Sequence, residues 1–433
     1  MNAEEEDVVV GAGVAGLAAA HALRLAGRSV RVLEVADAVG GRMRTLRTKG
    51  FLVDTGAEQV PERGYPATWG LLGHLGVDRS AVPRIGRHLA VWRGGRARPG
   101  LAHPLGLLTG AGLGPRARLD LLRVSRVRPD FDHPERAALG TVAEFAGAFH
   151  PDVLDYLCQP VVSGFFGWRP ERSAAAPLLA LLAAVGPAST WRTYRDGMDT
   201  LARVLAASLD VTTGVRVDGV VSEPDSVRVL CGGGEIRARR VVLAVPAPVA
   251  RALHLNAPAH DAEFLAASTF TPVVKAHLML STRPTSRSYA IVVPAAEDRV
   301  VSTLILDHVK HPGRAPTGRG LVTVMANPAV APDLLDATDD EVVDVLSGAA
   351  QRFFPGLRAT TTGALVTRFR HGLPEATPRA LALRAAFATR PVGAVEYAGD
   401  WTGLVPCGEA AVRSGQQAAA RLLATTPARR EHA

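Results

Sequence analysis

The sequence has little cysteine and no long apolar run, and each shortage excludes a class of protein. Its 433 residues include only three cysteines, Cys158, Cys231 and Cys407, which lie far apart. Their spacing fits no metal site and predicts a reducing, cytoplasmic setting without structural disulfides. The longest apolar run, residues 174–185, is shorter than the roughly 18 residues that a membrane helix needs. We therefore expect no integral membrane segment, and the acidic start MNAEEED does not have the basic character of a signal peptide.

Lysine is almost missing, although the chain is basic. The formal net charge is +8, and of the 49 lysines and arginines only Lys49, Lys275 and Lys310 are lysine. The arginines are scattered along the chain, whereas a nucleic-acid-binding protein gathers its positive charge on one face or element. We therefore expect no nucleic-acid partner. The length is sufficient for two or more domains, and the composition is that of an ordinary globular protein.

Glycine, in contrast, is abundant at the start of the chain. Residues 8–45 read VVVGAGVAGLAAAHALRLAGRSVRVLEVADAVGGRMRT, which predicts a strand, a tight turn, a helix and a second strand. Gly11, Gly13 and Gly16 have the spacing of a dinucleotide fingerprint, in which the glycines permit the turn, the approach of a pyrophosphate and close helix packing. The helix N-terminus, near Ala15, then offers backbone N–H groups to the phosphates.

An acid and a second glycine turn indicate which dinucleotide binds. Glu34 follows Gly16 by eighteen residues, where a carboxylate can hold the ribose hydroxyls of an adenosine; Asp37 is the alternative. Gly41 and Arg42 lie in the next turn, VGGRMRT, which supplies cations for a second phosphate clamp. A nicotinamide fingerprint needs no such clamp, so the pattern favours the extended cofactor FAD.

Several blocks together resemble a known family. GAGVAGLAAA, VLEVADAVGGRMRT and FLVDTGAE resemble the glutathione-reductase-type FAD domain of the flavin amine oxidase, protoporphyrinogen oxidase and phytoene desaturase superfamily. YRDGMDTLARVLAASL, RRVVLAVPAPVARAL and PVGAVEYAGDWTGLVPCGEAAVRSGQQAAARLL extend the resemblance to the end of the chain. The resemblance implies an FAD-dependent oxidoreductase with non-covalent FAD, O2 as electron acceptor and a small-molecule substrate.

The same resemblance implies how the domains are arranged. The expected fold class is α/β, with a discontinuous Rossmann-like FAD-binding domain formed by residues 1–80, 195–255 and 385–433. Residues 81–194 and 256–384 would form an α+β substrate domain with a helical part and a mixed sheet. Because ligands prefer domain interfaces, we expect the active site between that sheet and the flavin.

Further cofactor contacts are carried over from the family. Gly41 and Arg42 would lie beside the pyrophosphate, and Gly56 would lie near the flavin. Later in the chain, the resemblance implies contacts from the backbone of Val215 or Val217 to the adenine, from Asp400 to the ribityl and pyrophosphate region, and from the helix that begins near Glu409 and Ala410 to the flavin pyrimidine oxygen.

Lys275 is the first candidate for catalysis. Alternation along TPVVKAHLMLS puts Lys275 and His277 on one face of a strand, and a charged side chain in an apolar strand is costly to bury. The stretch resembles the strand of amine oxidases whose lysine holds a water at flavin N5. The alternative is a lysine at a strand edge with its ammonium in solvent. We expect His277 to be structural.

Glu58 and three pocket residues complete the candidates. Glu58, after the DTGA turn, could act as a base or anchor a cationic substrate, or be a solvated loop residue. Cys407 stands where many monoamine oxidases have a tyrosine of an aromatic cage, a departure that argues against a simple monoamine; its alternative role is packing. Phe166 and Trp168, in the aromatic stretch SGFFGW, line either a substrate pocket or the core.

Four functions remain open at this point. The first is oxidation of a C–N bond of a small, largely apolar metabolite. The second is C–C desaturation or porphyrinogen oxidation, the third is redox-neutral isomerisation, and the fourth is a non-catalytic flavoprotein. The alanine-, glycine- and arginine-rich composition is typical of a high-GC bacterial genome, so we expect a role in secondary metabolism. A homodimer is the expected oligomeric state.

Overall fold

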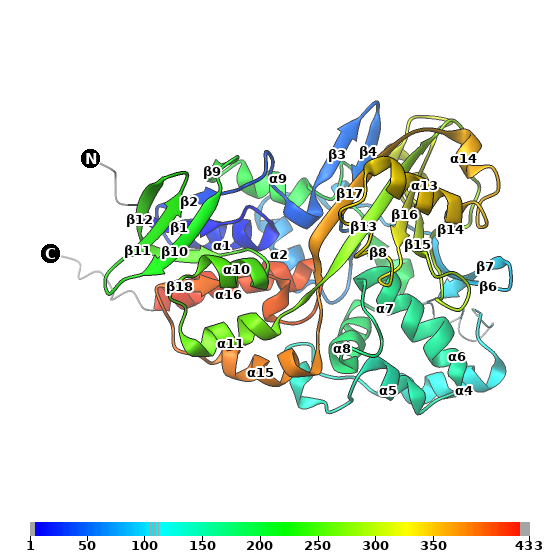
Figure 1. Cartoon of the computed structure of the whole chain (residues 1–433), viewed down its shortest axis with the longest axis horizontal. Coiled ribbons are helices and arrows are strands. Elements are labelled where there is room, and N and C mark those ends of the chain that lie inside the picture. The colour runs from blue at the N-terminus through cyan, green and yellow to red at the C-terminus, as the bar shows by residue number, and fades with distance from the viewer. Residues whose placement is uncertain (1–4, 102, 104–105, 107–109, 111, 425–433) are drawn as a thin grey trace.

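Two large sheets organise the molecule. The computed structural model describes residues 5–101, 103, 106, 110 and 112–424. In these residues two seven-stranded sheets lie side by side, and the long strands β13 and β17 run from the centre of the molecule into the second sheet (Figure 1).

The first sheet joins the N-terminal strand to strands from much later in the chain. Its central strands are parallel, and an antiparallel meander extends one side. Across the sheet the order is β10 (Val217–Ser222), β11 (Val227–Cys231), β12 (Gly234–Leu243), β1 (Glu5–Val10), β2 (Val30–Leu33) and β9 (Asp210–Thr212), and β18 (Val395–Tyr397) also pairs with β12. The strand, turn and helix predicted from the opening glycine stretch are confirmed.

Two helices from opposite ends of the chain cross on this sheet. They are α1 (Val14–Leu25) and α16 (Gly408–Ala424). A Cβ on Gly415 would lie 2.1 Å from the carbonyl oxygen of Ala15, so a side chain at this position would force the helices apart. The contact brings the C-terminal block beside the N-terminal glycine turn.

The second sheet is mixed, as predicted. β6 and β14 are parallel, and the other neighbours are antiparallel. The order is β17 (Thr361–Pro374), β13 (Phe270–Leu280), β16 (Gly320–Ala326), β15 (Val301–Leu306), β14 (Ser288–Val292), β6 (His88–Arg93) and β7 (Arg96–Leu101). Helix α13 (Asp339–Ala350), followed by α14 (Leu357–Thr360), packs on one face.

The alternation predicted for β13 is also confirmed. Ala276 and Leu278 share an apolar core with Val342 and Leu346 of α13. Lys275 directly precedes Ala276 and His277 directly follows it, so both face away from α13.

The segment before this sheet is largely helical, as expected. Its helices are α4 (Pro115–Val124), α5 (Val142–Gly147), α6 (Pro151–Val153), α7 (Gln159–Phe166) and α8 (Ala175–Val185). In the described ranges, no helix combines the length and the apolar character needed to cross a membrane.

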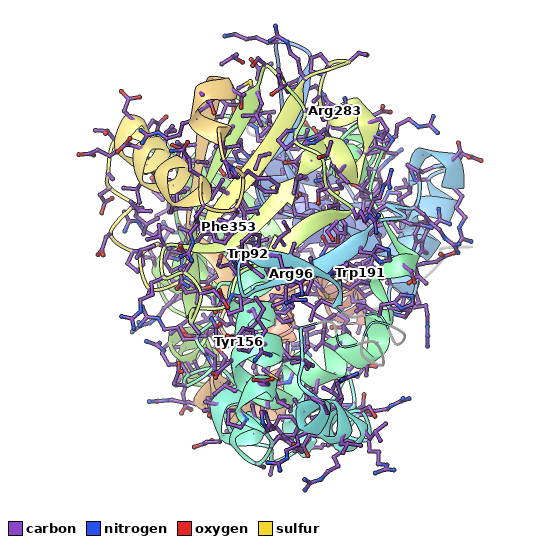
Figure 2. All side chains as sticks on the ribbon, turned by 90° about the vertical axis from the view of Figure 1, so that its right-hand side faces the viewer. Trp92, Arg96, Tyr156, Trp191, Arg283 and Phe353 are labelled. Carbon is purple, nitrogen blue, oxygen red and sulfur yellow. The ribbon has the colours of Figure 1, made fainter. Side chains whose placement is uncertain are left out.

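The hairpin β6–β7 was not predicted, because this segment was interpreted as helical. Gly94 and Gly95, with φ of 58° and 75°, form its turn. A glycine pair between two runs of strand-forming residues is the signal that could have revealed it. Trp92 at its end meets Phe353 edge-on, with 4.9 Å between ring centroids (Figure 2).

Smaller elements connect the two sheets. The hairpin β3 (Thr45–Thr48) and β4 (Phe51–Asp54) leads into the loop that carries Gly56 and Glu58. The remaining elements are β5 (Val60–Pro61), α2 (Pro66–His74), β8 (Trp191–Arg192), α9 (Thr200–Ala206), α10 (Ala247–Leu253), α11 (Ala259–Ala267), α12 (Asp307–Lys310) and α15 (Pro378–Ala388).

Candidate active site

The glycine turn between β1 and α1 presents bare backbone to any ligand. A Cβ on Gly16 would lie 2.0 Å from the carbonyl oxygen of Gly11, so this position requires glycine. A Cβ on Gly13 would meet nothing within 4 Å, and Gly13 caps α1 without a side-chain hydrogen bond. The first bond within the helix is donated by Leu17, so the amides before it, including that of Ala15, have no partner within the helix.

Glu34 lies at this turn, as predicted. Its carboxylate is 9% exposed and accepts hydrogen bonds from the amides of Ala12 (2.7 Å) and Ala36 (2.9 Å). The amide of Val215 donates to the carbonyl oxygen of Glu34 (2.9 Å), so these two predicted adenosine contacts are neighbours. Asp37, the alternative, is an exposed carboxylate paired with Arg44 at 2.8 Å.

Arg42 and Asp400 bind each other, which the sequence did not predict. The Arg42 guanidinium donates to both Asp400 carboxylate oxygens, at 2.9 and 2.7 Å, and to the carbonyl oxygen of Gly372 at 3.0 Å. The turn that contains Gly41 lies against the first glycine turn, because the amide of Gly40 donates to Ala12. The two glycine turns therefore form one continuous surface.

Gly56 packs directly behind Arg42. A Cβ on Gly56 would lie 2.1 Å from the carbonyl oxygen of Arg42, and the amide of Ala57 donates to that oxygen at 2.9 Å. A side chain at residue 56 would push the loop away from the second glycine turn.

The side chain at the start of α16 binds another helix. The Glu409 carboxylate accepts hydrogen bonds from the amides of Ala67 and Thr68 and from the Thr68 hydroxyl, so it caps α2. The amide of Ala410 donates to the Cys407 sulfur at 3.4 Å. The contact of the α16 N-terminus with a flavin stays a prediction.

Cys407 is a neutral thiol in a packed environment. Burial raises the pKa of the Cys407 thiol to about 12, although an interaction with the Tyr65 side chain partly opposes this rise. The Tyr65 ring also passes 3.7 Å from the position of a Cβ on Gly408. An aromatic ring is thus present beside Cys407, although it comes from a distant part of the sequence.

Trp168 does not line a pocket, and this prediction is corrected. Its side chain is completely buried, and its indole N–H donates to the carbonyl oxygen of Pro374 at 2.9 Å. Trp168 therefore belongs to the core between α7 and β17. The Phe166 ring lies beside it, with 5.3 Å between centroids, and its pocket role stays a prediction.

Lys275 is buried on an inner strand of the second sheet, next to the edge strand β17, so its ammonium does not lie in solvent. β13 lies between β16 and β17, and Lys275 is 3% exposed. Its Nζ donates to the carbonyl oxygen of Gly56 (2.7 Å) and to Glu58 Oε1 (2.8 Å). The two candidate catalytic residues are therefore in direct contact, and they meet at the loop that follows β4.

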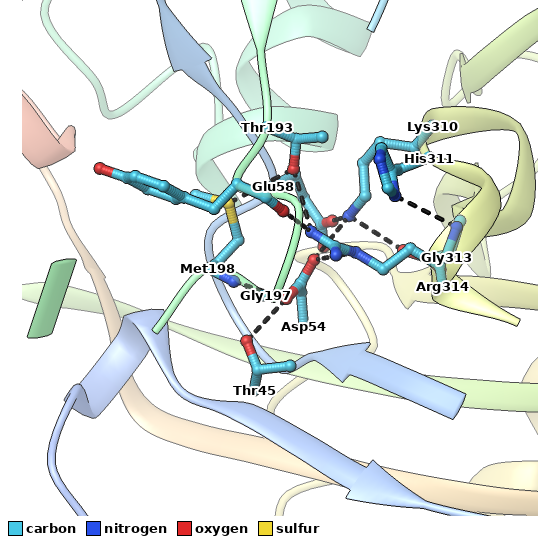
Figure 3. Close-up of polar contacts among 12 residues, drawn as sticks. Thr45, Asp54, Glu58, Thr193, Gly197, Met198, Lys310, His311, Gly313 and Arg314 are labelled. Atoms are coloured by element: carbon cyan, nitrogen blue, oxygen red, sulfur yellow. Dashed lines mark hydrogen bonds and ion pairs between the residues drawn. The ribbon is translucent and has the colours of Figure 1, made fainter. Parts of the chain in front are cut away.

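Glu58 also belongs to a larger cluster of buried charges (Figure 3). Lys310 Nζ lies 2.5 Å from Glu58 Oε2, 3.0 Å from Asp54 Oδ2 and 3.0 Å from Asp307 Oδ1. Arg314 Nε lies 2.9 Å from Asp54 Oδ2. With Lys275, three cations face three carboxylates, so the cluster is balanced in charge. The Lys310 ammonium fills the space between three carboxylates that could otherwise hold a metal ion.

Mutual attraction keeps Asp54 and Lys310 ionised. Burial alone would raise the pKa of Asp54, but Lys310 and Arg314 outweigh it and lower that pKa to about 2. Burial alone would lower the pKa of Lys310, but the carboxylates of Glu58, Asp307 and Asp54 outweigh it and raise that pKa.

His277 is the structural residue that the sequence predicted. The Thr323 hydroxyl donates to Asp307 Oδ2 (2.7 Å), so it must accept from His277 Nδ1, which lies at 2.8 Å. In the neutral ring Nε2 is an acceptor, so the Thr367 hydroxyl at 3.0 Å donates to it in preference to its longer contact, 3.4 Å, with the carbonyl oxygen of Thr55. His277 thus supports Asp307 from behind as a neutral ring.

Acid should destabilise the protein through His277. Burial and then the Lys275 ammonium lower the pKa of His277 to about 3. The unfolded chain binds this proton at about pH 6.5, so stability falls as the pH drops from about 6.5 towards 3. Between pH 7 and 5 the loss from this group is about 2 kcal/mol. Urea unfolding at both pH values should show that His277→Gln removes this loss, whereas the exposed His88→Gln keeps it. Equal pH dependence of the two variants would contradict the assignment.

Sequence reasoning missed Asp54, Asp307, Lys310 and Arg314. One signal was available: two of the three lysines in an arginine-rich chain belong to this cluster. A lysine that persists in such a chain is a candidate for a site that an arginine cannot fill.

The donors and acceptors at the two glycine turns fit an adenine dinucleotide. Open amides at the α1 N-terminus suit the phosphates, and the Glu34 carboxylate suits a ribose. The loop of Gly56 connects this surface to the buried lysine. Such an arrangement, with a dinucleotide surface beside a buried ammonium, is that of a flavoprotein.

Comparison with known proteins identifies the family. The family described as flavin containing amine oxidoreductase matches residues 14–423, so the chain belongs to it. The protein is an FAD-dependent oxidoreductase. Coproporphyrinogen III oxidase from Propionibacterium freudenreichii is 28% identical, over 97% of this chain and 92% of that protein. Protoporphyrinogen oxidase 2 from Arabidopsis thaliana is 31% identical, but over only 38% of this chain and 33% of that protein.

A solved structure agrees with the fold. Cyclohexylamine oxidase from Brevibacterium oxydans superposes with a TM-score of 0.75 at 20% identity, covering 97% of this chain and 98% of that chain. The likeness confirms the expected architecture of a Rossmann-like FAD domain with an α+β partner.

Glu34→Ala should weaken FAD binding at least about tenfold. A hydrogen bond to a charged group contributes about 1.5–3 kcal/mol, and tenfold in affinity corresponds to about 1.4 kcal/mol. Titration of the apoprotein with FAD, followed by quenching of flavin fluorescence, gives both dissociation constants. The matched control is Asp37→Ala, whose carboxylate is exposed and should leave affinity unchanged. The opposite pattern would assign the ribose to Asp37.

Proposed function

We propose that the protein oxidises a C–N bond of a small, largely apolar metabolite, with FAD bound non-covalently and O2 as electron acceptor. The observation that carries the proposal is the buried Lys275 ammonium, held by Gly56 and Glu58. Burying a cation is costly even when it is paired, and Lys275 is nevertheless buried at the loop that connects the two glycine turns with the second sheet.

The proposal assigns residues 1–80, 195–255 and 385–433 to the cofactor and residues 81–194 and 256–384 to the substrate. In support, every described strand of the first sheet comes from the first group of segments and every described strand of the second sheet from the other. The contact of Lys275 with Gly56 lies where the two groups meet.

The residues at this boundary suit a hydride transfer from an amine. The flavin, when bound, accepts the hydride equivalent that leaves the substrate carbon as the C=N bond forms. Lys275 uses two of its three N–H groups on Gly56 and Glu58, so the third can bind a water or a reacting group. An ammonium fixed in this way can stabilise negative charge that develops near it or pass a proton.

FAD should be released intact from the denatured protein. Cys407, the cysteine of the C-terminal block, is a neutral thiol that accepts a hydrogen bond from the amide of Ala410, and it is not activated for a bond to the flavin. Acid precipitation should leave a yellow supernatant with the mass of FAD. A flavin that stays with the precipitate would refute non-covalent binding.

Porphyrinogen-type C–C oxidation is the second candidate. Its support is the coproporphyrinogen III oxidase of Propionibacterium freudenreichii, which aligns along nearly the whole chain. Aerobic assays separate the two functions. Amine oxidation releases hydrogen peroxide and, for a primary amine, ammonia after hydrolysis of the imine, whereas porphyrinogen oxidation produces a fluorescent porphyrin. Peroxide and ammonia from an amine support the proposal, and porphyrin formation alone would replace it with the second candidate.

A further inference from the structure

We propose that Lys310 is a positioning residue: it fixes the Glu58 carboxylate, and Glu58 in turn fixes the Lys275 ammonium. The effect of Lys310 on catalysis rests on the role proposed for Lys275. The contacts among Lys310, Glu58 and Lys275 can be tested without measuring activity.

Carboxylates surround the Lys310 ammonium. Its side chain is fully buried, and an ammonium has three N–H groups. Nζ donates to Asp54 Oδ2 and Glu58 Oε2, and it forms an ion pair with Asp307 Oδ1 at 3.0 Å. Three carboxylates therefore hold the ammonium in place.

Glu58 is held from both sides. One carboxylate oxygen lies 2.5 Å from Lys310 Nζ, and the other accepts from Lys275 at 2.8 Å. Rotation of this carboxylate would separate it from at least one buried cation, which is costly because the lost partner would remain charged and unpaired.

The loop cannot provide this placement alone. Residues 55–59 lie between β4 and β5 and contain neither helix nor strand. Lys310 belongs to α12, between β15 and β16, so it ties the loop to the sheet that carries Lys275. Without Lys310, the loop would lose its anchor to α12 at the Glu58 carboxylate.

The choice of lysine supports this role. A compact ammonium can contact three carboxylates around one nitrogen, whereas a planar guanidinium spreads its donors in a fork. The chain otherwise uses arginine for almost every cation. Arg314, the next cation in the cluster, contacts Asp54 and backbone oxygens and does not touch Glu58.

The scarcity of lysine makes the inference directly measurable. Lysine labelled with 13Cε and 15Nζ gives signals from only three residues, and substitution of each lysine assigns them. The spectra are recorded on the FAD-loaded protein without substrate. Glu58→Gln keeps the shape of the side chain and removes its charge. Its spectrum therefore gives the reference position of the Lys275 signal when no carboxylate faces the ammonium.

The deciding variant is Lys310→Met combined with Asp307→Asn. It removes one positive and one negative charge together, so Asp54 and Glu58 still face Arg314 and Lys275. We expect the Lys275 signal to move most of the way to its position in Glu58→Gln. A signal that stays near the wild-type position would overturn the proposal, because charge balance alone would then hold Glu58.

A second measurement applies if the double variant does not fold. In Glu58→Gln itself, the signals of Lys275 and Lys310 should both move, because Glu58 bridges them, whereas the exposed Lys49 should not. An unchanged Lys310 signal would overturn the bridge. Neither result depends on the substrate, so a failure of the proposed C–N oxidation is recognised separately.

Discussion

Lys275→Met should slow the flavin half-reaction, the oxygen half-reaction or both by about 10²- to 10⁴-fold, the usual effect of removing one positioned proton-transfer or electrostatic group. Methionine keeps most of the volume of the buried stem and removes the charge. Glu58 would keep Lys310 as a partner, so the loop should remain in place. FAD should still bind, because the donors at the glycine turns and Glu34 are unaffected.

Stopped-flow absorbance measures each half-reaction separately. The matched control is Lys49→Met, which removes an exposed lysine and should leave both rates unchanged. If both rates of Lys275→Met also stayed within about twofold of wild type, far below the expected loss, Lys275 would be a packing residue. Porphyrinogen-type C–C oxidation would then become the better account.

Arg314→Met should cost about 3–5 kcal/mol of stability, the usual effect of breaking a buried ion pair from one side. The Arg314 side chain is completely buried and lies 2.9 Å from Asp54 Oδ2. It also donates to the carbonyl oxygens of Arg195 (2.9 Å) and Tyr194 (2.8 Å) and to the Thr193 hydroxyl (3.1 Å). The variant would leave these acceptors unpaired inside the protein.

Urea unfolding of the FAD-free protein measures this loss without a contribution from the cofactor. Arg319→Met, an exposed arginine five residues later, is the control and should change stability by less than about 0.5 kcal/mol. If Arg314→Met lowered the free energy of unfolding as little as Arg319→Met, the cluster around Asp54 would contribute little to stability.

The sequence was sufficient to predict the opening strand, glycine turn, helix and second strand, because their determinants are local. The spacing of Gly11, Gly13 and Gly16 within one turn leaves few conformations, and the period-2 pattern of β13 placed Lys275 and His277 on the correct face. In both cases the residues that decide the structure are within a few positions of each other.

The charge cluster could not be predicted because its partners are distant in sequence. Asp54 and Lys310 are separated by 256 positions, and each appears alone as an ordinary charged residue. Asp54 ends β4 and Lys310 ends α12, so only the tertiary fold brings them together. The same holds for Glu409, whose carboxylate caps a helix that begins 343 residues earlier, at Pro66.

The central claim is that this protein takes a hydride from an amine carbon, and anaerobic mixing with a substrate panel tests it most directly. The oxidised protein is mixed without O2 with a series of apolar primary and secondary amines and, separately, with a porphyrinogen, while the flavin absorbance is recorded. The account predicts bleaching by at least one amine within the time of a turnover and none by the porphyrinogen. Bleaching by the porphyrinogen, with no response to any amine, would contradict it.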